Sequence, residues 1–228
     1  ADKGAARLER TANNKGRRNM GQTDRDIEAI IQFWLGEADR DVALARDQHE
    51  RWYRGGPEVD EEIRERFGAQ VEEARAGGFS AWAGDPKGAT ALVILLDQFT
   101  RNLFRGTVDA YSGDAYALEV AKNATANDLH LRASTHEQIF LFHPYHHSEL
   151  VLDQDMGVTL MKGLRDRVDD SWREYMNDRV KGFSGHRDIV ARFGRFPHRN
   201  EIMARESTAD ESLFLAGGAQ DFGQRKSK

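Results

Sequence analysis

The fold of this chain is most constrained by six consecutive apolar residues, Ala91 to Leu96, which stand directly before a group of polar ones. The run is far shorter than the roughly 20 residues that span a bilayer. A segment that is apolar on every side must instead be covered by other parts of the same domain. We therefore expect a central helix over residues 88–104 in a soluble domain. With 228 residues, of which 39% are hydrophobic, the chain is long enough to bury such a helix.

Helix start and stop signals divide the rest of the chain, and no segment has the pattern of a strand. Prolines stand where helices would begin, at Pro57, Pro144 and Pro197, and glycines stand where helices would end. Capping patterns open a first helix at Thr23 and a last one at Thr208. Further helices are predicted over 40–54, 58–76, 112–125, 135–142, 145–164, 169–181, 184–193, 197–205 and 209–216.

These signals predict an all-α fold, a tetratricopeptide-like array of about ten antiparallel helices. No two segments match the tetratricopeptide consensus, so any repeat would be structural only. The chain contains no cysteine, which excludes disulfides, thiolate zinc sites and a cysteine nucleophile. Its net charge of −5 argues against a nucleic-acid-binding protein.

We expect a basic, flexible arm over residues 1–22, one all-α domain over 23–222 and a short tail over 223–228. The arm carries six basic and two acidic side chains and has no apolar periodicity. It could be a native extension, residues left from cloning, or the processed end of an organellar precursor. We accordingly expect a cytoplasmic protein, or one of an organellar matrix or stroma if the arm is a processed end.

The polar half of the helix over 88–104 is the first candidate site. Asp97 precedes Arg101, and Gln98 precedes Asn102, by four residues each, so both pairs would form one polar stripe on a buried helix. The stripe is either an internal ion pair that orients the helix or one wall of a polar pocket.

Three histidines and a carboxylate lie close together at positions 143–149. If the proline in this segment opens a helix, His143 should lie outside it and cannot share a face with His147, whereas His146, Glu149 and Asp153 should share one. The spacing matches neither a zinc protease nor a two-iron bundle, so we expect no metal. A structural His–Glu pair is favoured over a general base formed by His147 with Glu149.

A third segment, residues 186–200, is rich in arginine and histidine. Its turn leads into a predicted helix start, where free N–H groups and the helix dipole would favour an anion. The alternative is that its arginines form structural ion pairs with acidic helices. The candidate binding residues of this segment are His186, Arg187, Arg192, Arg195, His198, Arg199 and Asn200.

The motifs at 97–106, 147–149 and 186–200 together resemble domain-of-unknown-function family 924. The similarity runs from Ile27 to Phe222 and implies an all-α, tetratricopeptide-like fold without an established reaction. Thr100 replaces a frequent proline of relatives, and the positions of His143 and His146 are usually not histidine. A three-histidine site is therefore not a family feature.

Two functions follow from these patterns. The first is a helical binding or assembly module that receives a protein partner on its concave face or through its arm. The second is an enzyme that works without a metal or cofactor on a small anionic substrate, bearing phosphate or carboxylate. In the enzyme, His147 and Glu149 would transfer protons. The substrate would be bound by Asp97, Arg101, Asn102 and the candidate binding residues of the third segment.

Overall fold

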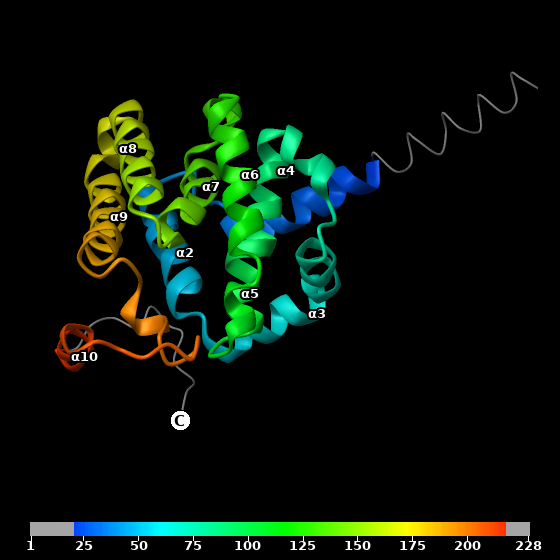
Figure 1. Cartoon of the computed structure of the whole chain (residues 1–228). Helices are drawn as coiled ribbons and strands as arrows, with labels where there is room; N and C mark the ends of the chain where they lie inside the picture. Colours follow the sequence, from blue (N-terminus) through cyan, green and yellow to red (C-terminus); the bar gives the residue numbers. More distant parts are fainter. Residues whose placement is uncertain (1–20, 218–228) are drawn as a thin grey trace, which may run out of the picture.

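The computed structural model describes residues 21–217, and this part of the chain is all-α, as predicted, with no strand (Figure 1). A first helix covers residues 21–35. The labelled helices are α2 (Val42–Arg54), α3 (Gly56–Arg75), α4 (Pro86–Val93), α5 (Thr100–Leu103), α6 (Asp114–Ala126), α7 (Thr135–His147), α8 (Val151–Arg167), α9 (Arg173–Phe193) and α10 (Ala209–Ala216). The finer tetratricopeptide-like arrangement stays a prediction.

The helix predicted over 88–104 is central and continuous, because a π-helical turn over Ile94–Phe99 joins α4 to α5. Every residue of its apolar run is fully buried. The Leu96 carbonyl accepts a hydrogen bond from Thr100 Oγ1 at 2.5 Å. A side chain at Gly113 would overlap that carbonyl oxygen, so only glycine lets the start of α6 approach the π turn this closely.

Aromatic residues from several helices fill the core. The Trp34 ring lies 5.3 Å from Phe99 and 6.1 Å from Phe140, measured between ring centroids. Trp34 is fully buried, and its carbonyl accepts a hydrogen bond from Trp52 Nε1 at 2.6 Å. The first helix, α2, the π turn over Ile94–Phe99 and α7 are therefore packed together around a single aromatic cluster.

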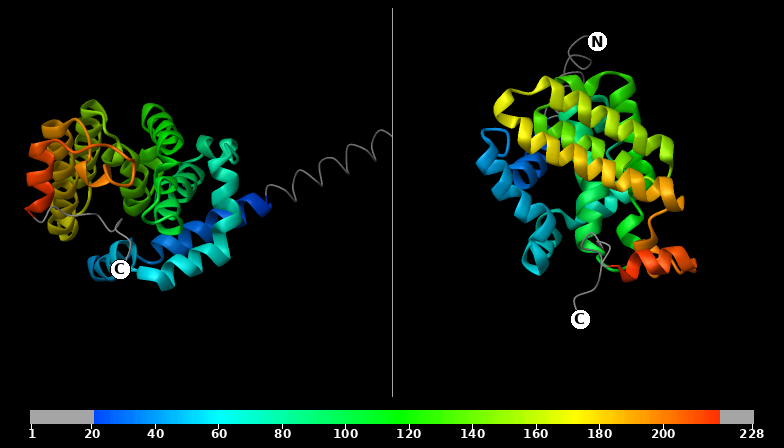
Figure 2. Two further views of the ribbon diagram at one scale, coloured as in Figure 1. Left: turned by 60° about the horizontal axis from the view of Figure 1, so that its bottom comes forward. Right: turned by 90° about the vertical axis from the view of Figure 1, so that its left-hand side faces the viewer.

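The helices are arranged around the α4–α5 helix. Figure 1 shows α8 and α9 together on one side of the molecule, α4, α6 and α7 in the middle, and α3 on the opposite side. Helices α8 and α9 also lie next to each other in both views of Figure 2. Helix α7 packs against α4, α6, α8 and α9, so it joins the centre to the α8–α9 pair. The end of α7 consequently lies where several distant segments meet.

Two predicted helix boundaries in the middle of the chain are wrong. Pro144 does not open a helix but lies inside α7, which continues to His147, and α8 begins only at Val151. As a result His143 and His147 lie one helical turn apart on the same helix, and Glu149 lies between two helices. The two helices predicted over 169–181 and 184–193 form the single helix α9.

The chain ends also differ from the prediction. The first helix already includes residues 21 and 22, before the cap expected at Thr23. A three-residue 3-10 turn, Pro197–Arg199, replaces the helix predicted over 197–205. The capping box at Thr208 is present and opens α10. The arm over 1–20 and the end of the chain after 217 lie outside the described residues, within which no helix is both long and apolar enough to cross a membrane.

Candidate functional site

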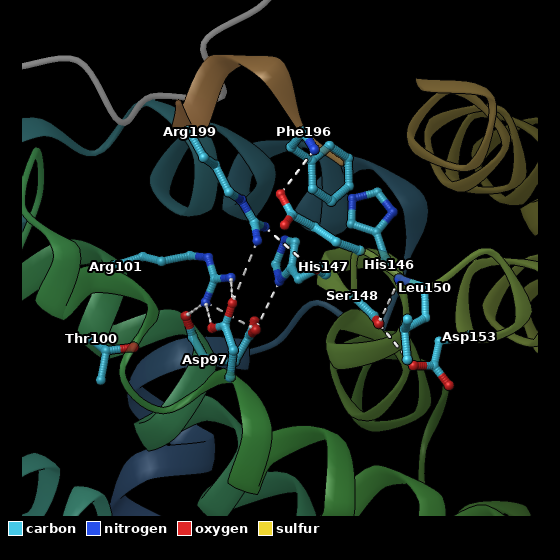
Figure 3. A network of polar contacts seen from close by, with 12 residues as sticks. Asp97, Thr100, Arg101, His146, His147, Ser148, Leu150, Asp153, Phe196 and Arg199 are labelled. Atoms are coloured by element: carbon cyan, nitrogen blue, oxygen red, sulfur yellow. Dashed lines mark hydrogen bonds and ion pairs between the residues drawn. The ribbon is translucent and has the colours of Figure 1, made fainter. Parts of the chain in front are cut away.

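The centre of the candidate site is a pair formed by Asp97 and His147. Asp97 lies in the π turn and is fully buried, while His147 is the last residue of α7. The Asp97 Oδ1 atom lies 2.7 Å from His147 Nδ1 (Figure 3). Because a carboxylate oxygen accepts, Nδ1 donates the hydrogen, and the lone pair of the neutral ring is on Nε2. That atom has no hydrogen-bond partner among residues 21–217, and 15% of the side chain is exposed.

Arg101 holds this pair in place from α5. Its Nη1 atom donates to Asp97 Oδ1 at 3.0 Å and to the Asp97 carbonyl at 2.7 Å. The same guanidinium binds both oxygens of Asp114, at 2.9 and 3.0 Å, from the first turn of α6. Burial alone would lower the pKa of Arg101, but Asp114 and Asp97 outweigh it and raise the pKa. The predicted pair of Asp97 and Arg101 is thus present, and it extends to a carboxylate that the sequence patterns did not indicate.

Arg199 enters the site from the opposite side, on the turn after Pro197. Its guanidinium carbon lies 4.7 Å from the ring centroid of Tyr111 and 4.6 Å from that of Phe196. One nitrogen donates to the His147 carbonyl at 3.1 Å, and another lies 3.8 Å from Asp114. Its Nε atom is buried without a partner among the described residues. Burial lowers the pKa of Arg199, and the carboxylate of Asp114, 3.8 Å away, offsets only part of this effect.

Further histidines surround His147. The His146 ring lies 5.0 Å from His147 and 3.6 Å from His186, between centroids, and His143 lies 5.6 Å from His147. Burial lowers the pKa of every ring in this cluster; for His186 it falls to about 3, and for His147 the fields of Arg101, His143 and Arg199 lower it further. The cluster therefore consists of neutral imidazoles at neutral pH.

His198 lies at the edge of this cluster. Its ring is 5.4 Å from Phe196, and burial together with Arg199 and His186 lowers its pKa to about 3. Two of the three histidines that the sequence placed on different faces, His143 and His147, thus come together on α7. They do so because α7 continues past Pro144 to His147 instead of ending before it.

Glu149 has a different partner from the one predicted. Its carboxylate accepts from both terminal nitrogens of Arg205, at 2.7 and 3.0 Å, and from the Phe196 N–H at 2.8 Å. Burial would raise the pKa of Glu149, but these hydrogen bonds lower it overall. Asp97, rather than Glu149, is the carboxylate paired with His147. Glu149 instead fixes the turn that carries Arg199, and its proton-transfer role stays a prediction.

Several predicted binding residues point elsewhere. Asn102 donates to Asp60 at 2.8 Å, and Gln98 bonds Asp97 instead of extending a stripe to Asn102. Arg195 binds both oxygens of Glu211, at 2.6 and 2.7 Å. Asn200 donates to Ser207 at 3.0 Å and to the same glutamate at 3.3 Å. These residues fasten α10 and α3 rather than line the pair of Asp97 and His147.

The two remaining arginines of the third segment lie on the surface of α9. Arg187 pairs with Asp155 at 2.8 Å and with Asp188 at 3.2 Å, all three largely solvated. Arg192 is exposed, and its guanidinium carbon lies 4.6 Å from the Phe193 ring centroid. The segment near Arg195 and Arg199 forms a 3-10 turn instead of the start of an α-helix. The predicted anion site therefore has no α-helix N-terminus to bind the anion.

Five residues therefore define what we call the dyad site: Asp97, Arg101, Asp114, His147 and Arg199. The three sequence motifs do converge on it. Asp114 was missed because a single acid in the first turn of a helix is common, and the close approach permitted by Gly113 has no signature in one sequence. Within residues 21–217 no group of three or more histidine, aspartate or glutamate side chains is placed to hold a metal ion.

Comparison with known proteins gives a family but no activity. A solved structure of a protein of unknown function from Agrobacterium tumefaciens is 32% identical and has a TM-score of 0.63; the match covers 78% of this chain and 99% of that one. No curated protein matches the chain. The model of a family described as "Bacterial protein of unknown function (DUF924)" matches residues 30–219. This match covers most of the chain, so the protein belongs to that family of bacterial proteins.

Proposed function

We propose that this protein is an enzyme that binds a small anionic substrate and transfers a proton through His147. The observation that carries the proposal is the contact of 2.7 Å between Asp97 and His147 Nδ1, with Nε2 left without a partner in the described part of the chain. A carboxylate on Nδ1 fixes the tautomer and orientation of an imidazole so that Nε2 can accept a proton. His147 is the general base in this proposal, and Asp97 positions it.

Arg199 is the group that would bind the anion. Its charge is less well neutralised than that of Arg101, since Asp114 contacts Arg101 through two short bonds and Arg199 only at 3.8 Å. Two aromatic rings pack against this guanidinium and leave its N–H groups for hydrogen bonding. Because that edge also contacts the His147 carbonyl, an anion held there would lie beside the proposed base.

Substrate binding and proton transfer would be coupled by charge. In the free protein, burial and the fields of Arg101 and Arg199 hold the pKa of His147 well below its usual range. An anion at Arg199 would offset part of that field and raise the pKa of His147. The imidazole would then gain its proton affinity only when a substrate is present, which suits a general base.

The test measures anion binding and the titration of His147 together. Calorimetry with inorganic phosphate and with acetate should detect binding that Arg199→Gln abolishes and that Arg40→Gln, at a solvated position, leaves intact. In NMR titrations, saturating anion should raise the pKa of the His147 ring, whose signal is assigned by its loss in His147→Gln. An unchanged His147 titration at saturating anion would contradict the proposal.

The second candidate is the helical binding module, and one surface favours it. Leu150, Leu152 and Met156, at the start of α8, are 64%, 83% and 48% exposed. Such a group of exposed apolar side chains is typical of a protein-binding surface. Replacing Leu152 and Met156 by glutamate should then abolish association with a protein partner while leaving anion binding unchanged. Loss of anion binding in the same variant would mean that the surface and the dyad site are not separate.

A further inference from the structure

Arg179 is a second cation near the histidine cluster, and it has no acidic partner. Among residues 21–217 no carboxylate forms an ion pair with it; the adjacent Asp178 lies 4.0 Å from Arg46 instead. Its Nε atom is buried and has no hydrogen-bond partner in the described part of the chain. A partly buried guanidinium without a counter-charge is costly, so a position of this kind favours an anionic ligand.

The surroundings of Arg179 hold its guanidinium in place. One face lies over the Tyr175 ring, with 5.1 Å from the guanidinium carbon to the ring centroid. Burial raises the pKa of the Tyr53 phenol, which comes from α2, and the nearby charge of Arg179 opposes that shift. Although 49% of Tyr53 is exposed, its hydroxyl end lies inward and contacts His143 Nε2 at 3.1 Å. Arg179 thus packs on Tyr175 and lies near Tyr53, rather than being free in solvent.

The hydrogen bonds around His143 fix the direction of each donor. His143 Nδ1 donates to the Ile139 carbonyl at 2.8 Å, so Nε2 accepts from the Tyr53 hydroxyl. That hydroxyl has thereby given its only hydrogen, so Tyr53 can offer no donor to an anion. Arg179 can, because a guanidinium has five N–H groups and its Nε atom has no partner among the described residues.

This second cation and the dyad site are linked by α7. His143 contacts Tyr53, and its ring centroid lies 5.6 Å from that of His147. Arg199 bonds the His147 carbonyl at the other end of this row. Two cations, one at each end, thus flank two imidazole rings on successive turns of α7.

We infer that Arg179 forms a second anion subsite beside Tyr53, so that the substrate of the proposed enzyme carries two anionic groups, one held by Arg199 and one by Arg179. This inference rests on the proposed function for the Arg199 end. The substrate class is a small dianion, such as a dicarboxylate or a phosphorylated carboxylic acid. The proton-transfer group, His147, would lie between its two charges.

The experiment is calorimetry on the full chain with unbranched dicarboxylates of increasing length, each paired with the monocarboxylate of equal length. We expect one range of lengths at which the dicarboxylate binds about 10-fold more tightly than its partner, as one added charge-assisted contact would give. Arg179→Gln should remove this advantage without changing monocarboxylate binding, Arg179→Lys should keep part of it, and Arg40→Gln should have no effect. Circular dichroism and the melting midpoint verify folding of each variant.

The failures of the two proposals are distinguishable. If monocarboxylates bind through Arg199 but no dicarboxylate binds more tightly, the second subsite is overturned and the proposed function stands. If Arg199→Gln leaves binding intact while Arg179→Gln abolishes it, the Arg179 subsite stands and the assignment of the anion to Arg199 falls. If neither class of acid binds, both proposals fall.

Discussion

Helix α7 carries two Asp–His pairs with the same contact and different surroundings. Near its start, His136 Nδ1 lies 2.7 Å from Asp39, and at its end, His147 Nδ1 lies 2.7 Å from Asp97. The other nitrogen of His136 contacts the Tyr175 hydroxyl at 3.0 Å, and that ring is fully buried. The other nitrogen of His147 has no partner within residues 21–217, and two arginines flank the ring.

The comparison shows that an Asp–His contact is not in itself a catalytic feature. In the first pair both ring nitrogens are satisfied, and Asp39 also accepts the His136 N–H at 2.9 Å, which fastens the start of α7. Such a pair stabilises the fold. In the second pair one nitrogen stays available and the surrounding charges act on it, which are the conditions that proton transfer requires.

The largest expected difference between the pairs concerns their aspartates. Asp97→Ala should lower the free energy of unfolding by about 3–5 kcal/mol, because it leaves the buried Arg101 without one of its partners. Asp39→Ala should cost about 1–2 kcal/mol, since that side chain is 36% exposed and water can replace it. Urea unfolding measures both. Equal losses would show that the dyad site is no more buried than the first pair.

The next largest effect is expected for Tyr175, whose hydroxyl contacts the second ring nitrogen of His136. Tyr175→Phe should lower the free energy of unfolding by about 1–3 kcal/mol, because it leaves a nitrogen of the buried His136 ring without a partner. Phosphate binding should be unchanged. If phosphate binding is weakened as well, the two pairs are coupled through α7 and cannot be treated as separate regions.

Lowering the pH should reduce the free energy of unfolding step by step, through the histidine cluster around the second pair. The pKa values of His186 and His198 are lowered to about 3 in the folded protein, from 6.5 when unfolded. Between these values the unfolded chain binds more protons, so stability falls as the pH is lowered from 6.5. Each such histidine should contribute about 1.4 kcal/mol per pH unit. Urea unfolding between pH 6.5 and 5 measures this slope, and His186→Gln should reduce it; a flat profile would contradict neutral rings.

The smallest effect is expected for an arginine that the sequence patterns included among the binding residues. Arg187 lies on the solvated face of α9, where it pairs with Asp155. Arg187→Gln should therefore leave the melting midpoint and phosphate binding unchanged within error. A loss of phosphate binding would extend the site onto that face.

Local rules predicted the features that depend on neighbouring residues. The contact between Asp97 and Arg101 follows from their spacing of four residues, and the capping box at Thr208 follows from its motif. The convergence of the three motifs on the dyad site has a general reason, since charged groups in a helical core need partners.

Other features depend on tertiary packing and have no local signal. Pro144 was expected to open a helix, yet all residues of α7 from His136 to His146 are buried, and this burial outweighs the loss of one backbone hydrogen bond. Asp114 and Arg179 were missed for a related reason. Their importance comes from what other helices place beside them, which no spacing along the chain encodes.

The π turn at Ile94–Phe99 makes the site sensitive to chain length in a way that the fold is not. A π turn contains about one residue more than an α-helical turn. Deleting a single residue from it would let the helix continue as regular α-helix with the parts on either side nearly unrotated, because a full turn would still be a full turn. The apolar half of the helix and Arg101 would keep their places, whereas Asp97 lies in the turn itself and would lose its present position. A one-codon deletion in this turn is therefore the smallest genetic event that could remove the contact between Asp97 and His147 while the helix stays intact.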